Sequence, residues 1–388
     1  MTTPRVDFDT DKVFFPPETT APPTIAPVDL GVRTKQAQPA HSDYQLPLHL
    51  TYLHDRESKE RAEAALLAKD ATHSRGAGRR PLPEEPDPLR TCFERDRDRI
   101  LHSAAFRRLA GKTQVFIFPD DHMRTRLTHA LEVAQVALSI AAPLRLNLAL
   151  VEAAALGHDV GHGPFGHTSE EALSLFLEEG YDHAPWGAYV VLAKSNLCAE
   201  TTDAIANHSW SRPAPSTPEG EVVAFADRIA YVCHDFEDAV KAGIVTVESL
   251  PETVRKRCGS RHAEQLGTFI TSVVETSSRN GQVSMDGDTA EALSVFRSFN
   301  YERIYLRPAS KKQAQTARRL IGALVEYFAD RPYKIVSSDT IQADLEAGSP
   351  EAVRAAVTYV AGMTDRFACR VALGQLGWEQ SELPTGIA

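Results

Sequence analysis

The pattern of apolar and polar positions predicts helices along almost all of the chain beyond about residue 95. Residues 127–144 (LTHALEVAQVALSIAAPL) are apolar on nearly every side, which is typical of a buried helix, and residues 148–157 continue in the same style. Residues 55–69 predict an earlier helix. Alternating β-branched runs are scarce, and TQVFIF at 113–118 is the best candidate for a strand or hairpin. The pattern therefore predicts an all-α fold with a small β-hairpin element at most.

Composition along the chain predicts a tail followed by one domain. Residues 1–45 are rich in proline and lack a sustained period, so we expect them to be disordered or loosely attached. Residues 46–378 are expected to form a single domain. Its core spans about 95–245, and a helical C-terminal part spans about 246–378.

Charge and cysteine usage narrow the class of protein. The formal net charge of −10 argues against a general electrostatic attraction to nucleic acid or to an anionic membrane. The N-terminus lacks the layout of a signal peptide, and the sequence has no run of about 18 apolar residues that would span a membrane. Five scattered cysteines without a CxxC pair predict reduced thiols. These features predict a cytoplasmic protein.

Three short stretches carry side chains that suit a metal ion. THALEV supplies His129, GHDVGHGPFGH supplies the pair His158 and Asp159, and FADRIAYVCHDFED supplies Asp227. Two imidazoles and two carboxylates form a ligand set for Mn, Fe, Mg, Co or Zn. Taken singly, each stretch has an ordinary explanation, such as a hydrogen-bonded core histidine or a solvated helix face. Together they predict a metal that activates water against an ester or a phosphate.

Residues next to these ligands suggest a phosphate-bearing substrate. Arg126 lies three residues before His129 and shares its helix face, where a metal-bound phosphate would balance its charge. Tyr231 and Asp235 share a helical stripe with the aspartate ligand, and Arg228 lies just beside that stripe. The sequence therefore predicts a nucleotide site one turn from the metal.

The loop after the His-Asp pair holds a candidate for proton transfer. His167 and Glu170 are spaced so that the carboxylate can orient the imidazole, although an ordinary loop histidine is the alternative. Thr168 and Glu171 fit a capping box and predict a rigid helix start. We assign His162 a structural role.

These motifs resemble the deoxyguanosinetriphosphate triphosphohydrolase-like family, a branch of the HD-domain phosphohydrolases. The resemblance covers about residues 74–375 and includes RDRDRILHSAAFRRLAGKTQVF and FNYERIYLRP besides the three stretches. It implies an HD-type helical bundle and a divalent metal ion. It also implies hydrolysis of deoxynucleoside triphosphates (dGTP or several dNTPs) to deoxynucleoside and inorganic triphosphate, and a homo-oligomer, either a hexamer or a tetramer.

The resemblance also implies roles for single residues. They are His129, His158, Asp159 and Asp227 as metal ligands; His167, Glu170 and His183 as catalytic residues; and Arg126, Arg228, Tyr231 and Asp235 as substrate contacts. His183 departs from the family pattern, because Ala184 follows it where an asparagine is usual. Lys112 and Gln114 lie in a segment that can approach the sugar.

The mechanism that follows is an in-line attack of metal-activated water on the α-phosphorus, with the nucleoside 5′-oxygen leaving. His167 is expected to be the general acid or proton shuttle. Because the sequence suggests no additional histidine cluster, we expect one tightly bound metal ion, with any additional Mg or Mn carried by the nucleotide.

Two other functions stay open. One is an HD phosphohydrolase that acts on nucleoside monophosphates or alarmones. The other is a regulator with weak activity, in which clustered arginines form an allosteric nucleotide site or bind single-stranded DNA weakly. Ion pairs with interleaved acidic residues explain the same cluster equally well. The arginines are Arg75, Arg79, Arg80, Arg95, Arg97, Arg99, Arg107 and Arg108.

Overall fold

The computed structural model describes residues 39–44, 48–335 and 344–386. The chain divides into two units, residues 1–54 and 55–388, and the second unit holds every helix named below. The disorder expected for residues 1–45 concerns positions that, apart from 39–44, lie outside the described residues. Within the described part, none of the helices combines the length and apolar character that a membrane crossing needs.

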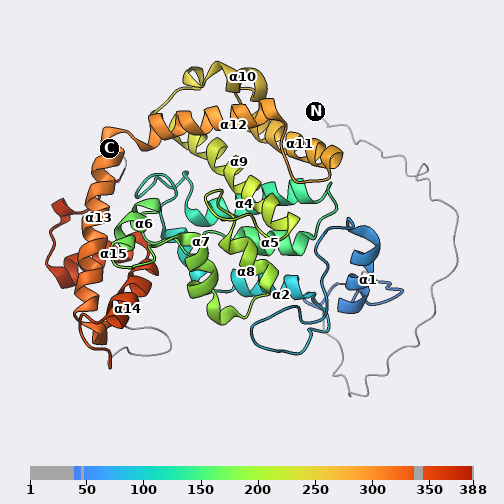
Figure 1. Cartoon of the computed structure of the whole chain (residues 1–388), viewed down its shortest axis with the longest axis horizontal. Helices are drawn as coiled ribbons and strands as arrows, with labels where there is room; N and C mark the ends of the chain where they lie inside the picture. Colours follow the sequence, from blue (N-terminus) through green and yellow to red (C-terminus); the bar gives the residue numbers. More distant parts are fainter. Residues whose placement is uncertain (1–38, 45–47, 336–343, 387–388) are drawn as a thin grey trace. The chain divides into compact units, whose positions relative to one another are not determined.

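The described residues are built from helices, which confirms the all-α prediction (Figure 1). The α-helices are α1 (Arg56–Leu66), α2 (Cys92–Leu101), α3 (Ala104–Arg108), α4 (Arg126–Ala141), α5 (Leu148–Gly157), α6 (His167–Ser174), α7 (His183–Trp186), α8 (Ala199–Ala206), α9 (Pro218–Lys241), α10 (Glu252–Cys258), α11 (His262–Asn280), α12 (Gly287–Asn300), α13 (Pro308–Ala329), α14 (Pro350–Ala361) and α15 (Asp365–Val371). Three π-helical segments of the described residues, Gly187–Val191, Tyr301–Tyr305 and Ala372–Leu376, directly follow α7, α12 and α15.

The predicted strand at 113–118 does not form. One isolated antiparallel bridge, between Thr113 and Thr125, is the β structure present in the described ranges. Thr113 is tied elsewhere, because its backbone amide donates to Asp365 across 3.0 Å. The segment after Thr113 instead lines a cavity described below.

The central core lies where α4 packs against both α5 and α9, with α2 on the other side of α5. Helix α5 is apolar around most of its circumference and is capped by Asn147, whose side chain accepts a hydrogen bond from the Leu150 amide. Its bounds match the prediction. Helix α4 ends at Ala141, three residues earlier than predicted, and α1 ends at Leu66 rather than residue 69.

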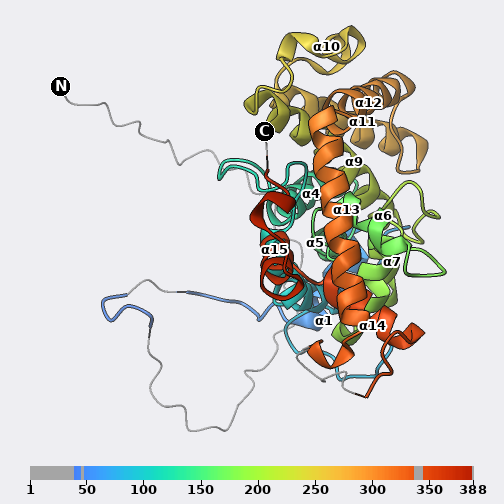
Figure 2. The ribbon, with the colours of Figure 1, turned by 90° about the vertical axis from the view of Figure 1, so that its left-hand side faces the viewer.

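A second apolar cluster packs the C-terminal helices against α6. Helix α13 runs alongside α6 and α14 (Figure 2), and Leu320, Leu324 and Phe328 of α13 are fully or almost fully buried there. Because α6 follows the His-Asp loop directly, this cluster supports one side of the predicted site.

Most of the clustered arginines form ion pairs. Arg80 and Asp96, both buried, are joined across 2.5 Å. The other pairs are Arg79 with Glu200, Arg95 and Arg99 with Glu84, and Arg97 with Asp98 and Glu152. For these five arginines the contacts favour the ion-pair interpretation over a groove for nucleic acid.

Candidate active site

The four predicted ligands come together where α4, the end of α5 and α9 meet. His129 Nε2 lies 3.1 Å from Asp227 Oδ1 and 3.9 Å from Asp159 Oδ2. His158 Nε2 lies 3.5 Å from Asp159 Oδ1 and 3.7 Å from Asp227 Oδ1. Helix α5 ends at Gly157, so His158 and Asp159 follow the helix end and can both face the same point.

The protonation states of His158 and Asp227 suit the binding of a cation at this centre. His158 Nδ1 donates to the Ala155 carbonyl oxygen across 2.6 Å, so the neutral ring keeps a lone pair on Nε2. That Nε2 atom is buried and has no hydrogen-bond partner. Burial alone would raise the pKa of Asp227, but the hydrogen bond from His129 holds it well below its usual value. A lone pair thus faces ionised carboxylates, which suits a divalent ion.

Arg126 joins this centre to the space beside it. Its NH1 group donates to Asp159 Oδ2 across 2.6 Å. Its Nε and NH2 groups are buried without a hydrogen-bond partner, and the side chain lines a cavity. One edge of the guanidinium is therefore fixed, and its other donors are left for a ligand.

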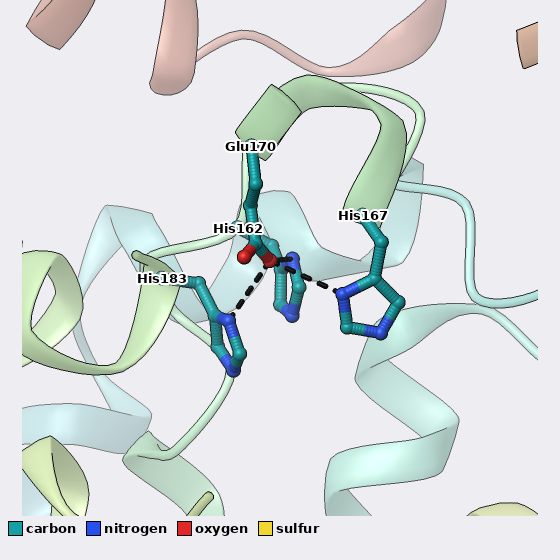
Figure 3. A group of neighbouring side chains, drawn as sticks. All are labelled: His162, His167, Glu170 and His183. Atoms are coloured by element: carbon teal, nitrogen blue, oxygen red, sulfur yellow. Dashed lines mark hydrogen bonds and ion pairs between the residues drawn. The ribbon is translucent and has the colours of Figure 1, made fainter. Parts of the chain in front are cut away.

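Three histidines converge on Glu170 next to the predicted metal ligands (Figure 3). Glu170 Oε1 lies 3.2 Å from Nδ1 of His167, 3.2 Å from Nδ1 of His162 and 2.9 Å from Nδ1 of His183. The predicted contact between His167 and Glu170 is present, and His183 lies in the same cluster. Burial alone would raise the pKa of Glu170, but the charge of His183 and the hydrogen bond from His167 keep it well below its usual value.

The assignment of His162 to a purely structural role does not fit its surroundings. Its Nε2 atom lies 3.2 Å from Asp159 Oδ1, and its ring stacks on His183 at 3.8 Å between centroids. Burial and the neighbouring charge of Arg126 hold the pKa of His162 well below its usual value, which keeps the ring neutral. His162 therefore links the predicted metal ligands to the cluster around Glu170, and the expectation of no additional histidine cluster is wrong.

His208 belongs to the same region and was not predicted. Its Nδ1 donates to the Ile205 carbonyl oxygen across 2.8 Å, and its Nε2 lies 3.2 Å from Nε2 of His183. Burial lowers the pKa of His208 to about 3. No local pattern in the sequence marks His208, because its contacts come from the packing of α8 against α5 and α7.

The start of α6 differs from the predicted capping box. Gly166 is the N-cap, with a φ of 65°, and the helix begins at His167, so Thr168 lies inside it. Glu171 is exposed and pairs with Arg318 across 2.8 Å. The earlier start places Glu170 in the first turn, where it can face the histidines.

A cavity of about 520 Å³ opens beside both clusters, and the four predicted substrate contacts line it. Arg228 lies with its guanidinium carbon 4.0 Å from the centre of the Trp210 ring. The hydroxyl of Tyr231 accepts a hydrogen bond from Arg297 across 3.0 Å. The cavity therefore has an aromatic and cationic wall on the side of α9.

Asp235 marks the opposite end of this wall. It accepts a hydrogen bond from the Tyr305 hydroxyl, and burial raises the pKa of Asp235 to about 7. Tyr305 belongs to the π-helical segment after α12, and sequence analysis had not singled it out. Gln114 also lines the cavity. Lys112 instead lies in the interior, where its amine donates to the His162 and Ala361 carbonyl oxygens.

Comparisons with known proteins agree with this geometry. Residues 126–232 match the HD domain, and residues 283–372 match the phosphohydrolase-associated domain. The first match begins at Arg126 and contains all four predicted ligands. HD domains bind a divalent metal ion and act as phosphohydrolases.

Relatives named "Deoxyguanosinetriphosphate triphosphohydrolase-like protein" match over most of their length. One from Caldanaerobacter subterraneus subsp. tengcongensis is 42% identical over 320 residues, which covers 81% of this chain and 93% of the relative. One from Desulfatibacillum aliphaticivorans is 38% identical, covering 81% and 95%, and one from Clostridium perfringens is 39% identical, covering 80% and 94%. The chain therefore belongs to the deoxyguanosinetriphosphate triphosphohydrolase-like family of HD-domain phosphohydrolases.

Proposed function

We propose that the protein hydrolyses deoxynucleoside triphosphates to deoxynucleoside and inorganic triphosphate. The observation that carries this proposal is that one cavity is lined by three of the predicted ligands, by the histidines around Glu170, and by Arg126 with its unpaired donors. The three ligands are His129, Asp159 and Asp227. A substrate with a long polyphosphate chain and a sugar would fill this space from the metal centre to Asp235.

In this proposal His129, His158, Asp159 and Asp227 hold the divalent ion. When bound, the ion stabilises negative charge on a phosphoryl oxygen and lowers the pKa of the attacking water. The His158 ring is already set for this role by its hydrogen bond to Ala155.

The arginines bind the triphosphate. Arg126 is held by Asp159 through NH1, and its buried Nε and NH2 groups need an acceptor, which phosphate oxygens would provide. Arg228 rests on Trp210 rather than on a carboxylate, so its positive charge is also available. Both contacts strengthen as charge builds on the leaving triphosphate and neighbouring oxygens.

His167 exchanges the proton. Its Nδ1 donates to Glu170, which fixes the ring and leaves Nε2 for the substrate. We assign the doubly protonated form of His167 the role of general acid: Nδ1–H stays bonded to Glu170, and Nε2–H passes its proton to the 5′-oxygen as the bond from that oxygen to the α-phosphorus breaks. Glu170 and His183 act with it, because both stand in the same cluster.

The sugar binds against Tyr231 and Asp235. The carboxyl of Asp235 lines the cavity one turn beyond Tyr231, where it can meet the 3′-hydroxyl.

For the protein as a whole we propose a single catalytic domain over residues 46–378 and a cytoplasmic homo-oligomer of six or four chains. We also propose that an allosteric nucleotide activates the protein and that it binds single-stranded DNA weakly. Activity assays with mixed nucleotides test the first point, and oligonucleotide-binding assays test the second.

Product analysis tests the proposal. The protein is incubated with Mn²⁺ and each of the four dNTPs, singly and mixed, and the products are separated. We expect inorganic triphosphate from the parent and none from His158→Ala. Activity in the mixture alone would identify an activating nucleotide. Release of pyrophosphate or orthophosphate, or hydrolysis of nucleoside monophosphates or alarmones instead, would refute the proposal.

A further inference from the structure

Four side chains outside the predicted ligand set bring their donor atoms to one point (Figure 3). They come from the loop after α5, from the first turn of α6 and from the start of α7. Nδ1 atoms of His162, His167 and His183 all lie within 3.2 Å of the same carboxylate oxygen, Oε1 of Glu170. Such convergence of three ring nitrogens on one oxygen needs a physical explanation.

Hydrogen bonds do not account for all three contacts. His167 Nδ1 donates to Glu170, whereas Nδ1 of His162 and Nδ1 of His183 are buried and have no hydrogen-bond partner. The last two nitrogens are close enough to the carboxylate, but their rings are not oriented to donate to it. Two buried polar atoms thus face an anionic oxygen without satisfying it.

The tautomer of His162 sharpens the conflict. Its Nε2 lies 3.2 Å from Asp159 Oδ1, a carboxylate oxygen that requires a donor. A neutral imidazole has one proton, which this contact uses. The lone pair on Nδ1 then points toward the Glu170 carboxylate across 3.2 Å. Two lone pairs at that distance repel each other unless a cation lies between them.

The same reasoning applies to His183. His208 donates its Nδ1 proton to Ile205, so its Nε2 is an acceptor, and the proton between the two rings belongs to His183 Nε2. The charge of His183 balances the Glu170 carboxylate, but its Nδ1, 2.9 Å from Oε1, is buried and makes no hydrogen bond to it. A bound metal ion satisfies both histidines and the carboxylate at once.

We propose that His162, His183 and Glu170 form a second metal site, which binds a first-row transition-metal dication such as Zn²⁺ through the two Nδ1 atoms and Oε1. His167, at the exposed rim, supplies the fourth donor. Imidazole nitrogens with one carboxylate oxygen suit Zn²⁺ or Co²⁺, whereas Mg²⁺ prefers oxygen ligands. None of these four residues belongs to the first ligand set.

The second site bears directly on the proposed reaction, and this consequence rests on the proposed function. A bound ion would occupy the His167 and Glu170 atoms that otherwise position the transferable proton. The two uses of the cluster therefore exclude each other, and a second ion lowers the rate of hydrolysis. Asp159 Oδ1 faces both His158 Nε2 and His162 Nε2, so the two ligand sets are neighbours.

Counting bound ions tests the site without reference to activity. The full chain is stripped with a chelator, dialysed against Zn²⁺, and analysed by mass spectrometry for ions per chain. We expect two for the parent, one for the double variant His162→Gln/His183→Gln, and one for Asp227→Asn. His102→Gln, which changes an exposed histidine at the end of α2, is the control and should bind two. One ion in the parent, or two in the double variant, would overturn the site.

Cobalt provides a second measurement that does not depend on the double variant folding. Glu170→Gln keeps the size of the side chain and removes its charge. We expect the second equivalent of Co²⁺ to produce intense visible bands of a tetrahedral complex in the parent and not in Glu170→Gln. Equal bands in both proteins would contradict the site. Two bound Zn²⁺ ions, together with no triphosphate release by protein that carries a single Mn²⁺ ion, would refute the proposed function alone. Triphosphate release by a protein that never binds more than one ion would refute this site alone.

Discussion

Arg126 and Asp159 form a buried ion pair, with 2.6 Å between NH1 and Oδ2 and side-chain exposures of 2% and 5%. Removal of one partner leaves the other charge buried without compensation, which typically costs about 3–5 kcal/mol. In the metal-free protein we therefore expect Arg126→Met to lower the free energy of unfolding by about that amount, measured by urea denaturation. Arg318→Met, which removes a surface pair with Glu171, should cost about 1 kcal/mol or less. Equal losses in the two variants would contradict a structural role for the buried pair.

Gly161 fixes the distance between the His-Asp loop and α7. A Cβ atom at this position would lie 2.0 Å from the His183 carbonyl oxygen and 2.5 Å from the Gly187 nitrogen. Both obstacles are backbone atoms, so Gly161→Ala must displace α7 and with it His183. We expect a loss of stability of about 1–3 kcal/mol and a reduced kcat. Thermal unfolding together with product release measures both.

The matched control is Gly267→Ala in α11, where nothing lies within 4 Å of the added Cβ. Alanine is the better helix former, so this variant should be stabilised by about 0.5–1 kcal/mol. A Gly161→Ala protein as stable and active as Gly267→Ala would show that the close approach of the two backbones is not required.

Features that depend on the local pattern of residues, such as the bounds of a helix, could be predicted from the sequence. Helix α5 was located at its observed bounds because residues 148–157 are apolar at every position except Glu152. The predicted ligands lie together because each is placed by a helix or a helix end. The capping box at Thr168 failed for a local reason as well: the backbone at Gly166 adopts a positive φ and starts the helix at His167.

The sequence could not predict contacts that exist between elements. His208 has no distinguishing neighbours in sequence, and His162, although it lies in the GHDVGHGPFGH stretch, makes its contact with His183 only in the folded chain. Both sets of contacts arise from the approach of α7 and α8 to the loop after α5. The segment 113–118 has strand-forming residues, but Thr113 is hydrogen-bonded to Asp365, and the pairing of this segment stops at the single bridge between Thr113 and Thr125. Contacts between distant elements therefore place the additional histidines in the site and prevent the predicted hairpin from forming.

We expect the free energy of unfolding to depend on pH because of the buried Lys112. Burial lowers the pKa of Lys112 from 10.5 to about 7. Between these two values the unfolded chain holds a proton that the folded chain has released, so the free energy of unfolding rises with pH. The slope is at most about 1.4 kcal/mol per pH unit, and the effect is lost as the pH falls toward 7.

Lys112→Met lacks this titration. Urea denaturation at pH 7, 8 and 9 should therefore show the parent gaining stability relative to the variant at each step. A difference that stays constant, or that shrinks with rising pH, would contradict a neutral folded-state Lys112 above pH 7.

We expect the substitution Glu170→Gln to lower kcat strongly while it changes the structure little. Glu170→Gln removes the charge that orients His167, and general acid catalysis typically contributes a factor of about 10²–10⁴. We expect kcat to fall within that range while KM changes little, measured by steady-state release of triphosphate from dGTP. Glu178→Gln, on the exposed surface after α6, is the control and should leave kcat unchanged. A Glu170→Gln enzyme with parental kcat would exclude the proposed proton transfer.

The central claim is that water attacks the α-phosphorus and the nucleoside 5′-oxygen leaves. Hydrolysis of dGTP by the Mn²⁺-loaded protein in H₂¹⁸O, followed by mass spectrometry of the products, tests it most directly. The account predicts one ¹⁸O atom in inorganic triphosphate, unlabelled deoxyguanosine, and no turnover by Asp227→Asn. Label in deoxyguanosine monophosphate beside pyrophosphate, or in orthophosphate, would contradict it.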